Sequence, residues 1–146
     1  MKPTHPVELL ACAIATQEGF FSPSGNAMPQ LKRNPGDIRF DRQLNATAPE
    51  WSGPPAAPPI ATFSTEETGT AGLFRQLWLQ VAEGQTVRQI VGQWAPGGVD
   101  HNNPGVYLTN VLAWTGLPAD TPVLDLLVPL VNLAVAANQD AKPIPL

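Results

Sequence analysis

Glu18 is the residue whose position most directly suggests chemistry. The residues before it place apolar side chains at the spacing of one buried helical face, and Glu18 takes the next position on that face. These apolar residues are Val7, Leu10, Ala11 and Ile14. A carboxyl group among apolar side chains, at the negative end of a helix, should have a raised pKa and can deliver a proton to a leaving oxygen. The alternative is that Glu18 extends into solvent where the helix ends at Gly19.

A second carboxylate, as glycosidases use, has several candidates in this sequence. They are Asp37, Asp41, Glu66 and Glu67. None can be placed relative to Glu18 from spacing alone, so a two-carboxylate site stays open at this stage. Glu67 follows Ser64 by three residues, which predicts a capping box at a helix start. Asn34 precedes Pro35 and Gly36 in a turn, where its side chain is suited to bonding the backbone.

The aromatic residues fall into two groups. Phe74, Trp78, Trp94 and Trp114 lie at helical spacing and are predicted to be core residues. Tyr107 can face either a cleft or the core, and Trp51 stands in a proline-rich loop with no periodic neighbour. His101 beside Asp100 has no matching nucleophile, and Cys12 lies one step off the first apolar face. A Ser/His/Asp or Cys/His hydrolase is therefore not indicated.

The elements that must position these residues are mainly helices. Apolar periodicity and capping residues predict helices that begin at Thr4, Ser64, Thr86, Asn103 and Asp120 and end near Gly19, Gly84, Pro96, Gly116 and Asn138. Residues 37–40 and 60–63 are predicted to pair as short strands, and residues 142–146 to be extended. We expect one mainly α (α+β) domain over residues 1–146, with a small irregular β region after the first helix.

Composition excludes several functional classes. The chain has 146 residues, enough for one core, and its net charge of -4 without a run of like charges argues against a nucleic-acid partner. One cysteine and two distant histidines predict neither a disulfide nor a metal site. No stretch is long and apolar enough for membrane insertion, and Pro3, Pro6 and Glu8 interrupt what would be a signal peptide. We therefore expect synthesis in the cytoplasm without a signal peptide.

Several segments, in their order along the chain, resemble the lysozyme-like lytic transglycosylase domains of phage and bacterial cell-wall lysis proteins. They are residues 13–20, 33–38 and 63–69, followed by 94–96, 102–104 and Tyr107. Together they extend over most of the chain, from about residue 7 to residue 126. The resemblance implies a lysozyme-like fold for the single domain.

The resemblance also implies roles for particular residues. Glu18 corresponds to the family's general acid/base, and Asn34, Pro35 and Gly36 correspond to its cleft-lining loop. Asp37 and Tyr107 join Asn34 and Pro35 as expected substrate-binding residues. Asp37 stands where the family usually has Asn, so it is either a second catalytic carboxylate or a tolerated turn residue. No metal or cofactor is implied.

The implied activity is cleavage of the glycosidic bond between N-acetylmuramic acid and N-acetylglucosamine in peptidoglycan glycan strands. Attack by the sugar's own 6-OH gives a 1,6-anhydro product, whereas attack by water makes the enzyme a lysozyme. The expected place of action is the cell wall or periplasm, or a virion. The alternative is a catalytically weak or inactive structural or wall-binding component of a virion or secretion machine, which the low positive charge favours. A helical interaction domain with an exposed Glu18 and no groove is a third reading.

Overall fold

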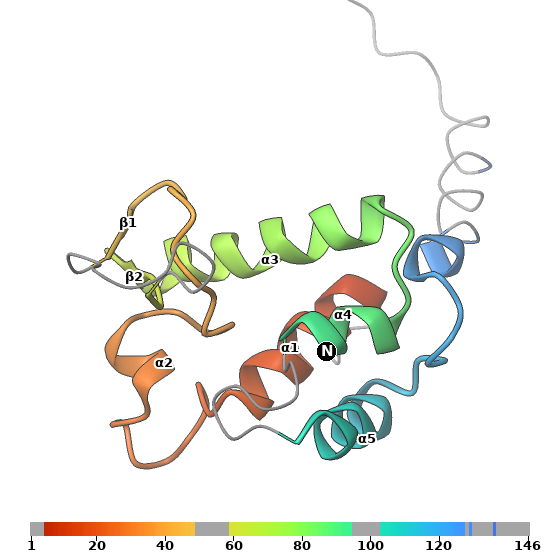
Figure 1. Ribbon diagram of the computed structural model, residues 1–146, viewed down its shortest axis with the longest axis horizontal. Coiled ribbons are helices and arrows are strands. Elements are labelled where there is room, and N and C mark those ends of the chain that lie inside the picture. The colour runs from red at the N-terminus through yellow and green to blue at the C-terminus, as the bar shows by residue number, and fades with distance from the viewer. Residues whose placement is uncertain (1–4, 49–58, 95–102, 128, 130–135, 137–146) are drawn as a thin grey trace, which may run out of the picture.

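The computed structural model describes residues 5–48, 59–94, 103–127, 129 and 136. Within them the protein is mainly helical, with one small antiparallel sheet (Figure 1). The elements in chain order are α1 (Pro6–Gln17), α2 (Met28–Leu31), β1 (Ala46–Thr47), β2 (Thr62–Phe63), α3 (Glu66–Ala82), α4 (Val87–Trp94) and α5 (Pro104–Thr115). Residues 123–127 form a further helical turn after α5. The predicted mainly α class is confirmed.

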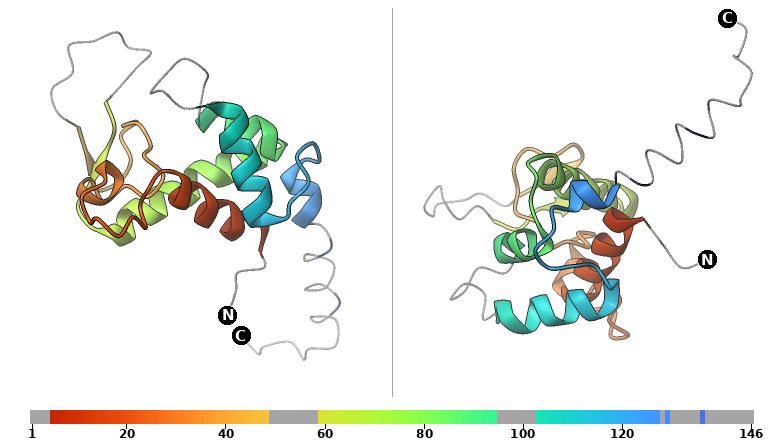
Figure 2. Two further views of the ribbon diagram at one scale, coloured as in Figure 1. Left: turned by 90° about the horizontal axis from the view of Figure 1, so that it is seen from below. Right: turned by 90° about the vertical axis from the view of Figure 1, so that its right-hand side faces the viewer.

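Helix α1 lies at the centre of the helical packing. It packs against α5 and α3, and both views of Figure 2 show α5 beside it. Its predicted apolar face is confirmed, since Val7, Leu10 and Ile14 are fully buried. The predicted cap Thr4 lies outside the described residues, and His5 caps the helix by accepting a hydrogen bond from the Val7 amide at 3.3 Å. Because the apolar side chains of α1 are buried against α3 and α5, the end of the helix, and with it Glu18, has a fixed position.

The β region differs from the sequence prediction. Strands β1 and β2 form an antiparallel pair in which Ala46 lies opposite Phe63. The predicted pairing of residues 37–40 with residues 60–63 is found only in part, as an isolated bridge between Arg39 and Ile60. Backbone hydrogen bonds from the Ala61 amide to Ile38 O at 2.9 Å and from the Phe40 amide to Pro59 O at 2.8 Å flank this bridge. The physical reason for the partial pairing is that Asp37 adopts a left-handed conformation with φ of 47°, which is incompatible with an extended strand. Only the end of the predicted partner strand 60–63 belongs to a sheet, as β2.

Helix α3 begins one residue later than predicted. Thr65, not Ser64, is the cap. Its side-chain oxygen accepts a hydrogen bond from the Thr68 amide at 3.2 Å, and the Thr65 amide donates to the Thr68 side-chain oxygen at 3.2 Å. The predicted Ser64–Glu67 box is therefore wrong, because a threonine pair provides both bonds. The predicted caps of the next helices are confirmed: Thr86 accepts from the Gln89 amide at 3.2 Å, and Asn103 caps α5.

Two of the predicted core tryptophans are on the surface. Trp78 is 44% exposed and Trp114 is 49% exposed, whereas Phe74 and Trp94 pack partly buried against the core. The buried stripe of α3 runs through Leu73, Leu77 and Val81, so Trp78 lies at its edge, where it contacts the His5 ring. Trp51, His101 and residues 142–146 lie outside the described residues. In the described part of the chain, no helix combines the length and apolar character needed to cross a bilayer.

Candidate functional site

Glu18 and Tyr107 meet where the end of α1 faces the first turn of α5. The Tyr107 hydroxyl donates a hydrogen bond to Glu18 Oε1 at 2.8 Å, although the two residues are 89 positions apart. Next to this pair, Asn110 Nδ2 donates to Gln17 Oε1 at 3.0 Å. These two bonds tie the C-terminal end of α1 to α5, so the Glu18 carboxylate has a defined position rather than extending freely into solvent.

Local sequence explains why Tyr107 is available at this point. Asn103 Oδ1 accepts hydrogen bonds from the Gly105 and Val106 amides at 3.0 and 3.2 Å, and Pro104 occupies the first turn of α5. The cap fixes the direction in which α5 starts. Tyr107 then falls one turn into the helix, on the side that faces α1.

The environment of Tyr107 keeps its hydroxyl protonated. Its side chain is only 1% exposed, and burial raises its pKa well above the ordinary value. The negative charge of Glu18, their hydrogen bond and the negative charge of Asp37 raise the pKa of Tyr107 further. Tyr107 therefore acts as a fixed hydrogen-bond donor. Glu18, by contrast, is half-buried, and Tyr107 binds one of its carboxylate oxygens.

Asp37 belongs to the same group of charges. The negative charge of Asp37 contributes to the raised pKa of the Tyr107 hydroxyl, so Asp37 lies in the neighbourhood of the pair that Glu18 and Tyr107 form. Asp37 is half-buried and follows Gly36, whose carbonyl accepts a hydrogen bond from Trp94 Nε1 at 2.6 Å. This bond anchors the Asp37 loop to the end of α4. Spacing in the sequence could not reveal this proximity.

Asn34 and Pro35 hold the loop from inside. Asn34 is 0% exposed; its Nδ2 donates to Ile38 O at 2.8 Å and to Ala61 O at 2.9 Å, and its Oδ1 accepts from Ile38 N at 3.0 Å. Pro35 is also buried. Both side chains are buried, and the substrate contact that the resemblance implies for them stays a prediction. Their position suits the support of Asp37, because Asn34 fixes the turn that carries it.

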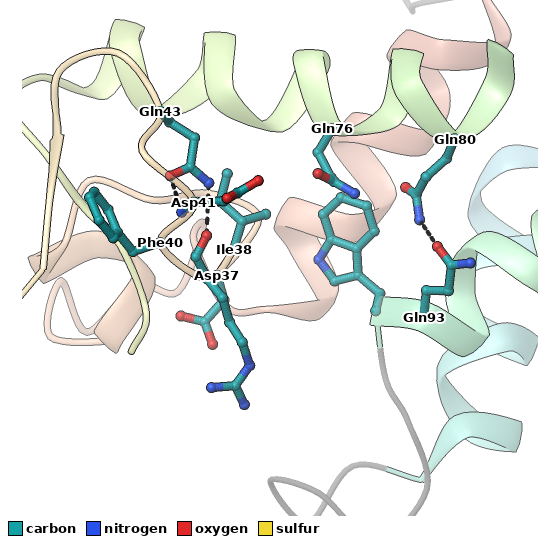
Figure 3. A pocket seen from close by; sticks show the side chains of 10 residues that line it. Asp37, Ile38, Phe40, Asp41, Gln43, Gln76, Gln80 and Gln93 are labelled. Atoms are coloured by element: carbon teal, nitrogen blue, oxygen red, sulfur yellow. Dashed lines mark hydrogen bonds between the residues drawn. The ribbon is translucent and has the colours of Figure 1, made fainter. Parts of the chain in front are cut away.

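A cleft of about 350 Å³ opens between the Asp37 loop and helices α3 and α4 (Figure 3). Its lining comprises residues 37–41 and Gln43 of the loop, Gln76 and Gln80 of α3, and Gln93 and Trp94 of α4. Of the three residues Glu18, Tyr107 and Asp37, Asp37 lines this cleft. Neither Glu18 nor Tyr107 is part of the lining.

The glutamines of the cleft were missed by sequence analysis. Gln76 and Gln80 are four residues apart on α3 and thus share one helical face, and Gln80 is 3% exposed next to the buried Val81. A polar residue inside an otherwise apolar helical stripe was the available signal. Across the cleft, Gln80 Nε2 donates to Gln93 Oε1 at 2.7 Å.

No described group of three or more His, Cys, Asp or Glu side chains is arranged to hold a metal ion. Comparison of the chain with protein-family models, with curated proteins and with solved structures finds no significant match. Function must therefore be inferred from the side chains and their geometry.

Proposed function

We propose that the protein is a peptidoglycan-cleaving glycosidase with a lysozyme-like fold and that Glu18 is its general acid/base. The observation that carries the proposal is the hydrogen bond from the buried Tyr107 hydroxyl to Glu18 Oε1, with Asp37 close by. A half-buried carboxyl group whose position is fixed by a buried donor is suited to proton transfer. The resemblance in sequence around Glu18 and residues 33–38 supports the same assignment, as does the small β region that follows α1 in the chain.

The proposed reaction begins with protonated Glu18. Its proton passes to the glycosidic oxygen between N-acetylmuramic acid and N-acetylglucosamine, and the bond to the muramic anomeric carbon breaks. The Glu18 carboxylate then accepts a proton from the attacking hydroxyl, which is either the muramic 6-OH or water. Tyr107 orients Glu18 throughout, and the negative charge of Asp37 stabilises the positive charge that develops on the sugar ring.

The substrate of this proposal is the glycan strand of peptidoglycan, reached at the cell wall or periplasm or from a virion. A second candidate is a catalytically weak or inactive wall-binding component of a virion or secretion machine. The net charge of -4 favours it, because an acidic protein gains no electrostatic attraction to an anionic wall. The two candidates differ in whether glycosidic bonds are cleaved.

The test is digestion of purified peptidoglycan by the wild type, Glu18→Gln and Glu8→Gln, with soluble fragments identified by mass spectrometry. Glu8 is a matched control because it is an exposed glutamate in the first turn of the same helix. We expect fragments from the wild type and Glu8→Gln, and none from Glu18→Gln with an unchanged or raised thermal midpoint, since a desolvated carboxyl destabilises the fold. Cleavage by Glu18→Gln rejects the assignment, and a folded but inactive wild type favours the wall-binding candidate.

The products and one further variant define the mechanism. Fragments that lack one water relative to the reducing muropeptide identify a transglycosylase, and reducing fragments identify a lysozyme. Asp37→Asn introduces the residue usual in the resembling family. If Asp37 is a second catalytic carboxylate, this variant loses most of its turnover. Full activity would make Asp37 a turn residue whose left-handed conformation Asn adopts equally well.

A further inference from the structure

Gln80, which lines the cleft, has a buried side-chain oxygen without a hydrogen-bond partner among the described residues. Its side chain is 3% exposed, its Nε2 donates to Gln93, and its Oε1 is buried with no hydrogen-bond partner among the described residues. Rotating the amide by half a turn leaves a polar atom at the same position, so the unmet bond does not depend on which atom is oxygen. A buried polar group without a partner costs stability, which makes it a candidate for ligand binding.

The surroundings of Gln80 indicate what such a ligand looks like. Gln76 lies one helical turn away on the same face, and Gln93 is exposed and retains its own amide nitrogen as a donor (Figure 3). Trp94 and Ile38 add apolar surface to the lining. The glutamines supply neutral donors and acceptors close to apolar contacts. A secondary amide suits this combination, because its N–H and C=O can bond two glutamines while its carbon substituent contacts the apolar surface.

We infer that Gln76, Gln80 and Gln93, the glutamine cluster, bind a secondary amide group of the substrate. The identity of the ligand rests on the proposed function, because peptidoglycan carries secondary amides in two places: the acetamido groups of its sugars and the bonds of its stem peptides. The cluster therefore holds a part of the substrate in the cleft that Asp37 also lines, apart from the contact between Glu18 and Tyr107.

The test measures binding by isothermal titration calorimetry in the full chain carrying Glu18→Gln, which separates binding from cleavage. The probes are the N-acetylglucosamine trimer and N-acetylmuramyl-L-alanyl-D-isoglutamine. We expect Gln80→Met, which keeps the side-chain length, to weaken binding of a probe about tenfold through loss of one buried hydrogen bond. Its thermal midpoint should be unchanged or raised, because an unmet buried carbonyl is removed.

Gln85→Met is the matched control. Gln85 Oε1 is also buried without a hydrogen-bond partner in the described part of the chain, but Gln85 does not line the cleft. This variant should bind the probes as the parent does. Binding of the sugar trimer assigns the acetamido group as ligand, and binding of the muramyl peptide alone restricts the ligand to the amides of the muramyl residue and its stem peptide.

Two results overturn the inference: neither probe binds, or Gln80→Met binds with the affinity of the parent. The proposed function fails separately, in the digestion of peptidoglycan by the chain with intact Glu18. If the wild type cleaves peptidoglycan and Gln80→Met binds the probes like the parent, only the proposed glutamine site is rejected. If binding depends on Gln80 but the wild type does not cleave peptidoglycan, the proposed enzyme activity is rejected and the binding site is supported.

Discussion

The helical region and the segment between α1 and α3 are stabilised in different ways. Helices α1, α3, α4 and α5 share a large apolar core, in which Leu10, Leu77 and Ile90 are fully buried. In the segment 19–63, the described residues form a much smaller buried cluster, Ile38, Ala61 and Phe63. The comparison shows that apolar burial positions Glu18 at the end of α1, whereas Asp37 depends on a region with little apolar core of its own.

In that segment, hydrogen bonds from polar side chains to the backbone stabilise the structure in addition to the small apolar cluster. Gln30 Nε2 donates to Phe20 O at 2.9 Å and to Ser22 O at 2.8 Å, while Gln30 Oε1 accepts from the Ala27 amide at 3.0 Å. Asn34 makes three such bonds in full burial. Side chains thus satisfy backbone groups that a sheet would otherwise satisfy. Such a segment should be sensitive to changes in hydrogen bonding and close packing rather than to loss of apolar volume.

The largest effect is expected where the two regions touch most closely. A Cβ atom on Gly69 of α3 would overlap the Arg33 carbonyl oxygen of the loop, so Gly69→Ala must push the loop away. We expect it to reduce the free energy of unfolding by about 3 kcal/mol or more, measured by urea denaturation. Gly92→Ala in α4 is the control, because its Cβ meets no atom within 4 Å and should stabilise the helix slightly. Equal effects of the two variants would show that the close contact is absent.

Asn34→Ala should have the next largest effect. It removes three buried hydrogen bonds and leaves the Ala61 carbonyl and the Ile38 amide without that partner. The expected loss in the free energy of unfolding is about 2 to 3 kcal/mol by urea denaturation. Asn103→Ala, at the exposed cap of α5, should lose about 1 kcal/mol. If Asn34→Ala lowers the free energy of unfolding no more than Asn103→Ala does, the buried hydrogen bonds of Asn34 are not what stabilises this segment.

Tyr107→Phe tests the contact between α5 and Glu18. Loss of the hydroxyl should lower the free energy of unfolding by about 1 kcal/mol. If the proposed function holds, it should also lower kcat more than it changes KM, because Glu18 loses its orienting donor. The raised pKa of Tyr107 keeps the hydroxyl protonated at working pH, so the variant should retain the alkaline limb of the pH–activity profile. Thr109→Val removes an exposed hydroxyl of the same helix and should leave turnover of peptidoglycan fragments unaltered.

The smallest effect is expected for a charge pair on the surface of the helical region. Arg88 donates to both oxygens of Asp120 at 2.7 and 3.1 Å, and this partner lowers the pKa of Asp120. A lowered pKa contributes stability above the ordinary value of aspartate, and the contribution is lost as the pH falls through the lowered value. Asp120→Asn should therefore lower the thermal midpoint slightly at pH 7 and not at a pH below that value. A large or pH-independent change would mean that the pair does more than a surface salt bridge.

Sequence patterns predicted the helical region well because its cause is local. The apolar stripe of α1, the caps at Thr86 and Asn103 and the left-handed Gly116 after α5 each depend on residues within a few positions. The predicted strand 37–40 is shortened to an isolated bridge at Arg39, because alternation of apolar residues does not reveal a left-handed Asp37. Trp78 and Trp114 were misplaced because the width of a buried face is set by the neighbouring helices.

The sequence by itself determined that Glu18 ends a helix whose apolar face is buried, since periodicity and capping act over a few residues. Only the tertiary structure decided which groups surround Glu18. Tyr107, Asp37 and the glutamine cluster come from separate elements, and the packing of α5 and of the Asn34 turn brings them near the end of α1 or into the adjoining cleft. The physical reason is that burial and hydrogen bonding between distant segments leave no periodic trace in the sequence.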